Sequence, residues 1–196
     1  MATPPSEQFA DILTDAYASR INFALTTLQI NGNGFREVAK ALQSGNIKVV
    51  ESNVDDADAE YDPYGNRFLI GAYDPSEYRT ISGRALLVHE AVHAIIDIKK
   101  LARTTQLTGE AAGYLAQVLY RLLSGDHFRE WARTNARVDP MAEIYQQCLV
   151  LIDRFELSGR FATISFPDYR PLRDAVHKHP RYRNVGEKQL HRADGL

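Results

Sequence analysis

Two histidines four residues apart enclose a glutamate in the segment His89-Glu90-Ala91-Val92-His93. Residues i and i+4 of a helix lie about one turn apart on the same face, so both imidazoles can converge on one metal ion. Glu90 is rotated by about 100° around the helix axis, beside such an ion, where its carboxylate can accept a proton from a bound water. The pattern predicts a zinc site with His89 and His93 as ligands and Glu90 as general base.

Apolar residues surround this motif at positions 85–88 and 94–96. We therefore expect a helix that is buried nearly all round and interrupted only by its His and Glu side chains. Buried imidazole and carboxylate groups need partners, and a metal ion supplies them. A chance match to HExxH is expected about 0.01 times in a chain of this composition. Chance and a buried, non-catalytic metal site are the alternatives.

A catalytic zinc ion usually has three protein ligands and one open position. Asp97 continues the row of His89 and His93, but on a straight helix it lies about 12 Å from His89 along the axis. This distance favours a role for Asp97 beside the site or on the helix surface. The only cysteine, Cys148, lies in an apolar helical stretch, and we interpret it as a core residue.

The next carboxylate along the chain is Glu110, at the start of a second helical run that ends near Gly125. The loop at about 103–108 is short enough to bring this helix back antiparallel to the first. Small residues after Glu110 permit close approach, so we expect Glu110 to face the histidine pair as the third ligand. A helix cap is its alternative role, because acids are favoured in the first helical turn.

With Glu110 as third ligand, residues 85–120 resemble the gluzincin class of zinc metallopeptidases, in which a Glu on a following helix completes a His, His, Glu site. The resemblance implies a zincin-like fold, one Zn²⁺ per chain and hydrolysis of peptide bonds. Thermolysin-like members have Asn before the third ligand and Asp three residues after it, where this chain has Gly109 and Gly113. The groups that orient His89 or His93 must therefore come from elsewhere, with Asp97 or a backbone carbonyl as candidates.

Composition limits the class of protein. With 196 residues and 44% hydrophobic content, the chain can bury a sizeable core and is expected to form one domain. One cysteine excludes an intrachain disulfide framework. No signal peptide or membrane span is recognised, which predicts a cytoplasmic protein, or one secreted by a route independent of a signal peptide. The net charge of −2 argues against general nucleic-acid binding.

Charge is unevenly distributed along the chain. Six acids and no Lys or Arg lie in residues 50–66, whereas residues 170–196 hold seven Lys or Arg and three acids. We expect a basic, irregular C-terminal tail from about residue 167. Solvated surface is the simple interpretation of both segments. The alternative is that the tail reaches an acidic patch, a partner or the active-site cleft.

Periodicity predicts an α+β fold, mainly helical, with a small antiparallel sheet packed on the HExxH helix. Besides the two helices above, helices are expected over 6–30, 35–42 and about 141–155, strands over 47–51, 66–73 and 161–166, and a turn over 62–65. HExxH peptidases commonly place an edge strand over the active-site helix, along which an extended substrate adds. Residues 66–73 are the candidate for this strand.

The sequence thus predicts a single-domain zinc metallopeptidase over residues 1–196 that hydrolyses a peptide or protein. A Tyr, His or Arg would stabilise the oxyanion, and the candidates are Tyr114, Tyr120, His127, Tyr169 and His177. One alternative is a metallopeptidase effector or toxin exported without a signal peptide, with an inhibitor or immunity protein as partner. The other is a non-catalytic, metal-stabilised interaction module.

Overall fold

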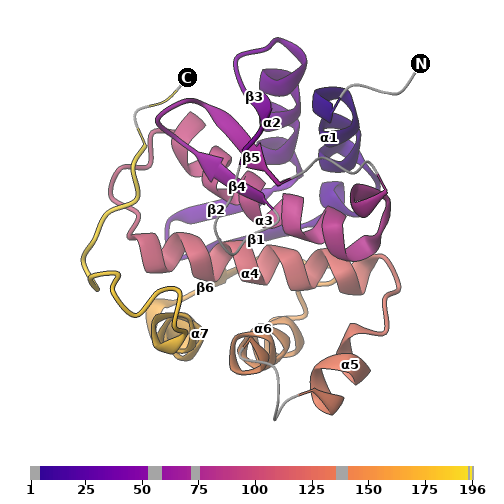
Figure 1. Cartoon of the computed structure of the whole chain (residues 1–196). Coiled ribbons are helices and arrows are strands. Elements are labelled where there is room, and N and C mark those ends of the chain that lie inside the picture. Colours follow the sequence, from indigo (N-terminus) through magenta and orange to yellow (C-terminus); the bar gives the residue numbers. More distant parts are fainter. Residues whose placement is uncertain (1–4, 53–58, 72–75, 136–140, 194, 196) are drawn as a thin grey trace.

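The computed structural model describes residues 5–52, 59–71, 76–135, 141–193 and 195. Within these residues the protein is α+β and mainly helical, with seven α-helices and two small three-stranded sheets. The helix α4 (Gln106–Leu123) crosses the middle of the molecule (Figure 1). Helix α3 (Ile81–Ile98), which carries the HExxH motif, packs against it.

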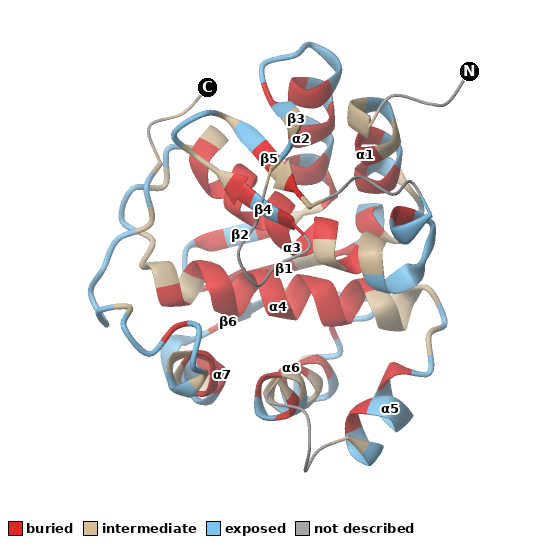
Figure 2. Cartoon of the chain, in the orientation of Figure 1, coloured by how far each residue is buried: buried red, intermediate tan, exposed pale blue. Residues whose placement is uncertain are grey.

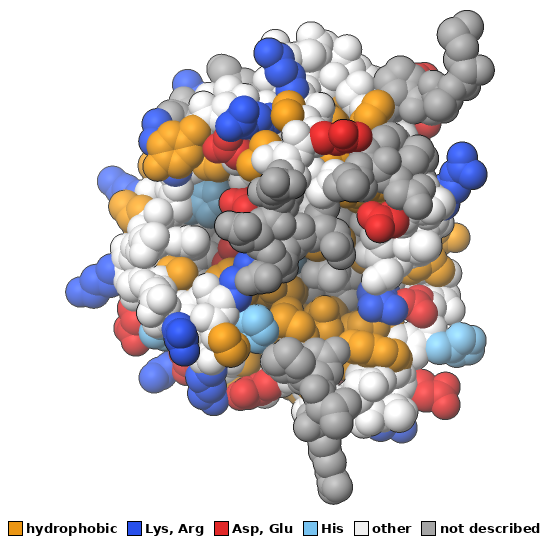
Figure 3. Space-filling view, in the orientation of Figure 1, with side chains coloured by type: hydrophobic (Ala, Val, Ile, Leu, Met, Phe, Trp, Pro, Cys, Tyr) orange, Lys and Arg blue, Asp and Glu red, His pale blue; other side chains and the backbone are white. Residues whose placement is uncertain are grey.

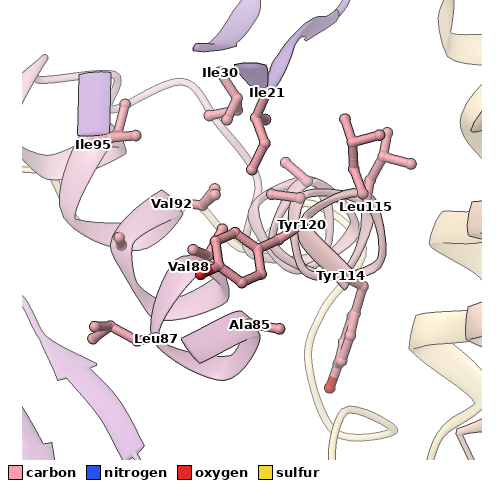
Figure 4. Close-up of a cluster of buried hydrophobic side chains, with 14 of the residues drawn as sticks. Ile21, Ile30, Ala85, Leu87, Val88, Val92, Ile95, Tyr114, Leu115 and Tyr120 are labelled. Atoms are coloured by element: carbon pink, nitrogen blue, oxygen red, sulfur yellow. The ribbon is translucent and has the colours of Figure 1, made fainter. Parts of the chain in front are cut away.

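These two helices form the centre of the hydrophobic core, and both are buried along most of their length (Figure 2). Val88 and Val92 of α3 and Tyr120 of α4 lie in the cluster between them (Figure 4). Both helices begin at a threonine whose hydroxyl caps the first turn: Thr80 accepts from the Gly83 N–H, and Thr105 accepts from the Thr108 N–H. Such caps satisfy backbone donors that have no partner within the helix.

Other helices cover both sides of this pair. The helices α1 (Pro5–Thr14) and α2 (Gly32–Gln43) pack on each other and on α3. On the opposite side, α4 contacts α5 (Phe128–Thr134), α6 (Ala142–Arg154) and α7 (Phe166–Lys178). The predicted helices near 35–42 and 141–155 are confirmed. None of the helices in the described ranges combines the length and apolar character that crossing a bilayer requires.

The first sheet has the order β2-β1-β6, with β1 (Asn22–Leu25) antiparallel to β2 (Leu28–Asn31) and parallel to β6 (Ala162–Ile164). The prediction of one helix over 6–30 is therefore wrong. Helix α1 ends early because the Asp15 carboxylate accepts from the backbone N–H groups of Tyr17 and Ala18 and closes a turn. The chain then forms a hairpin.

The second sheet has the order β3-β5-β4, with β3 (Lys48–Glu51) parallel and β4 (Ala59–Asp62) antiparallel to β5 (Arg67–Ile70). It is mixed, which corrects the predicted antiparallel sheet. Because β5 lies between the other two strands, residues 67–70 are not an edge strand; residues 72–73 lie outside the described ranges. The edge strand that contacts α3 is β4.

Two further predictions concern polar segments. No strand was predicted between residues 51 and 62 of the acidic run, yet β4 lies there; Asp55, Asp56 and Asp58 fall outside the described residues. The tail is not irregular from residue 167, because α7 extends to Lys178. Its Pro167 is in the first turn, where the missing N–H costs nothing. The irregular part begins at residue 179, and we call residues 179–193 the C-terminal segment.

Candidate metal centre

Side chains of α3 and α4 meet in a buried polar cluster. The ligand atoms of His89, Glu90 and His93 all lie within 4.8 Å of one another. From α4, Glu110 directs Oε2 to within 3.3 Å of His89 Nε2 and Oε1 to within 3.5 Å of His93 Nε2. All four side chains are buried, with at most 8% of any residue exposed.

Hydrogen bonds assign the tautomer of His93. The Nδ1 atom of His191 lies 2.7 Å from the carbonyl oxygen of Arg192, which can only accept, so His191 carries its proton on Nδ1. The Nε2 atom of His191 is then an acceptor, and it lies 3.0 Å from His93 Nδ1. His93 therefore donates from Nδ1 and presents an Nε2 lone pair to Glu110.

His89 has the same orientation. Its Nδ1 lies 3.2 Å from Oε1 of Gln117, which accepts its proton, so Nε2 again faces Glu110. Burial acts to lower the pKa of His89, but its hydrogen bond to Glu110 and the charges of Glu90 and Glu110 outweigh burial and raise the pKa, so Nε2 donates to Glu110 in the metal-free cluster. Gly113 makes this possible, because a Cβ atom at that position would lie 2.8 Å from the Cδ2 and Nε2 atoms of the His89 ring. Glu110, Gly113 and Gln117 are spaced i, i+3 and i+7, which places them on one face of α4.

The surroundings shift the pKa values of the Glu90 and Glu110 carboxylates in opposite directions. Burial raises the pKa of Glu90 to about 7, although the neighbouring His89 acts against it. Burial also acts to raise the pKa of Glu110, but the nearby His93 and His89 and a hydrogen bond from Tyr182 outweigh it and lower this pKa to about 2. Burial lowers the pKa of His93 to about 3, which keeps this imidazole neutral.

Edge strand β4 is fastened to α3 at two points by one residue. The backbone N–H of Tyr61 donates to Glu90 Oε2 at 2.9 Å, and its hydroxyl donates to Asp97 Oδ2 at 2.8 Å. Asp97 is fully buried, so it is not a helix-surface acid. Within the described residues, no hydrogen bond joins Asp97 to His89 or His93, so Asp97 does not orient either histidine directly. Its role is to hold the strand that positions Glu90.

The C-terminal segment crosses this cluster. The His191 ring lies edge to edge with the His93 ring and nearly parallel to it, with the ring centroids 5.2 Å apart. Backbone hydrogen bonds from Gln106 to Gln189 and from His191 to Thr104 attach the segment to the loop between α3 and α4. Arg181 and Tyr182 line two cavities of about 370 Å³ each, and Glu90 lines both. The C-terminal segment therefore contributes to both spaces at the cluster.

Of the aromatic and histidine side chains considered for the oxyanion, only Tyr114 lies at the cluster. Its ring packs edge-on against His89, with centroids 4.4 Å apart, and its hydroxyl is 2.8 Å from that of Tyr182. Tyr120 points elsewhere and donates to Asp15. The remaining three, His127, Tyr169 and His177, line neither cavity.

Sequence reasoning missed four residues of the cluster: Gln117, Arg181, Tyr182 and His191. Gln117 could have been found, because it lies two helical turns after Glu110 on the same face. The other three come from a segment without periodicity, about 70 to 80 residues further on, and no local pattern marks them.

Three comparisons were made, with protein-family models, with curated protein sequences and with solved structures. No match was found in any of them. What the structure establishes is a buried group, His89, Glu90 and His93, on α3 that could hold a metal ion.

Proposed function

We propose that the protein is a zinc metallopeptidase of zincin-like type in which His89, His93 and Glu110 hold the metal. The observation that supports this best is the spacing between each histidine Nε2 atom and the nearest Glu110 oxygen. Ligands of one tetrahedral zinc ion with bonds of 2.0 to 2.2 Å are separated by about 3.4 Å. The two Nε2 atoms lie 3.3 and 3.5 Å from the Glu110 oxygens.

The protonation pattern supports the same conclusion. His93 directs an Nε2 lone pair toward the ionised Glu110 carboxylate, so two acceptors face each other in a buried place. A cation removes this repulsion, and at His89 Nε2 it would replace the proton that is shared with Glu110. Gln117 and His191 accept the hydrogen bonds that metal-bound histidines usually donate from Nδ1. A bound Zn²⁺ supplies Lewis-acid activation of a water and of the substrate carbonyl.

Glu90 is the proposed general base. Its carboxylate lies beside the proposed ligands but is not one of them. A pKa of about 7 suits a group that accepts a proton and later donates it. In peptide hydrolysis it would remove a proton from the attacking water and deliver it to the leaving amine. The Tyr61 N–H fixes its carboxylate.

The substrate carbonyl needs a hydrogen-bond donor for the oxyanion that develops. Tyr182 and Arg181 are the proposed donors, because both line the two cavities and Arg181 interacts electrostatically with Glu90 and Glu110. We propose that an extended peptide occupies the cavity between β4 and the C-terminal segment and continues into the second cavity beside His89. The edge strand β4 takes the place that residues 66–73 were expected to fill.

Zinc content and hydrolysis, measured on matched variants, test the proposal. Purified wild type should carry about one zinc per chain by elemental analysis and lose it to a chelator, whereas Glu110→Ala should lose most of it. Glu90→Gln should retain zinc and the fold but lose at least 99% of peptide hydrolysis, because a general base contributes about 10² to 10⁴-fold. Glu37→Gln is the control, because Glu37 is exposed on α2 and lines neither cavity.

Two outcomes would contradict the proposal. If wild type carries no zinc under conditions that preserve bound metal, the proposed metal site is wrong. If Glu90→Gln hydrolyses peptides as fast as wild type, Glu90 is not the general base. Zinc binding without hydrolysis of any peptide would favour the metal-stabilised interaction module. Copurification with an immunity protein would instead favour an exported effector with the same chemistry.

A further inference from the structure

A third, larger cavity lies apart from the metal cluster. It has a volume of about 730 Å³ and lies between the β1–β2 hairpin, the loop joining α3 to α4, the start of α7 and residues 187–188. Organic ligands typically occupy cavities of about 300 to 1,000 Å³. No described residue that lines it also lines the two cavities at the cluster. The space is therefore a separate candidate site.

The lining of this cavity is strongly basic. One acid, Glu187, accompanies four cations: Lys100, Arg103, Arg173 and Lys188. Across the described residues, the ion pairs of the protein involve none of these four. Lys and Arg side chains also follow the edge of the molecule where the C-terminal segment and α7 lie (Figure 3). An excess of unpaired positive charge in a concave space favours an anionic ligand.

Arg173 is the most informative of these cations, because only 8% of it is exposed. Its Nη2 donates to the backbone carbonyl of Glu187 at 2.6 Å. A guanidinium carries five N–H donors, and within the described residues no carboxylate lies within ion-pair distance of it. A buried charge without an opposite charge is costly. An anion in the cavity would reduce this cost and could accept two parallel hydrogen bonds.

The cavity also has an apolar wall. Phe166 is 43% exposed although its ring is large and hydrophobic, and the Arg173 guanidinium lies 5.9 Å from its centroid. Leu101 and the buried Tyr169 complete this wall. An inorganic ion would leave these surfaces in contact with water. A ligand with an apolar body would cover them.

We propose that this cavity binds a small organic anion whose carboxylate or phosphate pairs with Arg173 and whose apolar body lies against Phe166. The inference does not depend on zinc or on hydrolysis. It concerns a surface that the peptidase proposal leaves unused.

Calorimetric titration of wild type with four probes tests both halves of the proposal. Phenyl phosphate and benzoate carry an anionic head and an aromatic body, inorganic phosphate has only the head, and benzyl alcohol only the body. We expect at least one aromatic anion to bind at least tenfold more tightly than both partial probes. The preference between the two aromatic anions distinguishes a phosphate from a carboxylate ligand.

Variants then locate the binding. Arg173→Met should weaken binding of the aromatic anion at least tenfold, and Arg170→Gln, on the same helix but outside the cavity, should leave it within twofold. If Arg173→Met does not fold, the exposed pair Arg103→Gln with Lys188→Gln should weaken binding at least threefold. Equal binding of inorganic phosphate and phenyl phosphate, no binding of either aromatic anion, or binding indifferent to these substitutions would overturn the proposal.

Discussion

At the scale of single residues, Glu90 and Glu110 form an informative contrast. Both carboxylates are buried among the same imidazoles, yet burial raises the pKa of Glu90 to about 7 while the histidines and Tyr182 lower that of Glu110 to about 2. Two acids whose pKa values are driven apart by their surroundings are suited to different tasks. Glu110 remains an anion for a cation to bind, and Glu90 can exchange a proton near neutral pH.

Glu90→Gln should change how the stability of the metal-free protein depends on pH. Because the folded pKa of Glu90 is raised from 4.5 to about 7, its stabilising contribution is complete below pH 4.5 and is lost as the pH rises through 7. The free energy of unfolding of wild type, relative to the variant, should therefore fall by about 3 kcal/mol between pH 4 and pH 8. Urea denaturation with chelator present measures it.

Glu110→Gln provides the control with opposite sign. Its folded pKa is lowered to about 2, so its contribution is present above pH 4.5 and is lost as the pH falls through 2. Relative to this variant, wild type should gain stability as the pH rises from 2 to 4.5. Parallel stability curves for wild type and either variant would show that these two carboxylates do not titrate as described.

At the scale of elements, Tyr61 holds β4 against α3 through two hydrogen bonds, one to Glu90 and one to Asp97. Tyr61→Phe removes the hydroxyl that donates to Asp97 and leaves a buried carboxylate with the Gly195 N–H at 3.0 Å. We expect a loss of about 1 to 3 kcal/mol in the free energy of unfolding. Tyr64→Phe on the adjacent turn, where Tyr64 is 74% exposed, should change it by less than about 0.5 kcal/mol. Equal effects of both substitutions would show that the hydrogen bond from Tyr61 to Asp97 does not stabilise the position of β4.

Local pattern predicted some elements well and others poorly. Helix α3 and helix α4 were predicted because their apolar residues and their start and stop signals agree, and the strand at 47–51 because its residues favour extended structure. The hairpin of β1 and β2 was missed because Ile21, Leu25 and Leu28 also fit a helical spacing of i, i+4 and i+7. Strand β4 was missed because its charged residues hide the alternation of Ala59 and Tyr61. Pairing across a sheet is non-local, so the central position of β5 was not predictable.

At the scale of the whole molecule, the cluster joins three parts of the chain that are distant in sequence. Helix α3 supplies the histidines, α4 supplies Glu110 and Gln117, and the C-terminal segment supplies His191. Only the contact between α3 and α4 could be predicted from the sequence, because these two helices are adjacent along the chain. A metal ion in the cluster would therefore tie the C-terminal segment to the core.

Zinc should accordingly raise the melting temperature, and His191→Ala should reduce this gain. Loss of a hydrogen bond to a metal-bound histidine typically costs about 10 to 100-fold in metal affinity. By linkage this corresponds to about 1.4 to 2.8 kcal/mol, or a melting temperature about 3 to 10 °C lower at saturating zinc. Calorimetry of the zinc-loaded proteins measures it, with His127→Ala as control because His127 is exposed and outside the cluster. Equal melting temperatures would mean that His191 does not support the site.

The face of α4 that touches the histidines has a consequence for finding relatives. Glu110 faces both imidazoles, Gly113 leaves room for the His89 ring and Gln117 accepts from it. Each position admits few residue types, for a reason of charge, space or hydrogen bonding. A protein with the same centre should therefore carry HExxH followed, on the next helix, by ExxGxxxQ. This joint signature could identify distant relatives even where the rest of the chain has diverged beyond recognition.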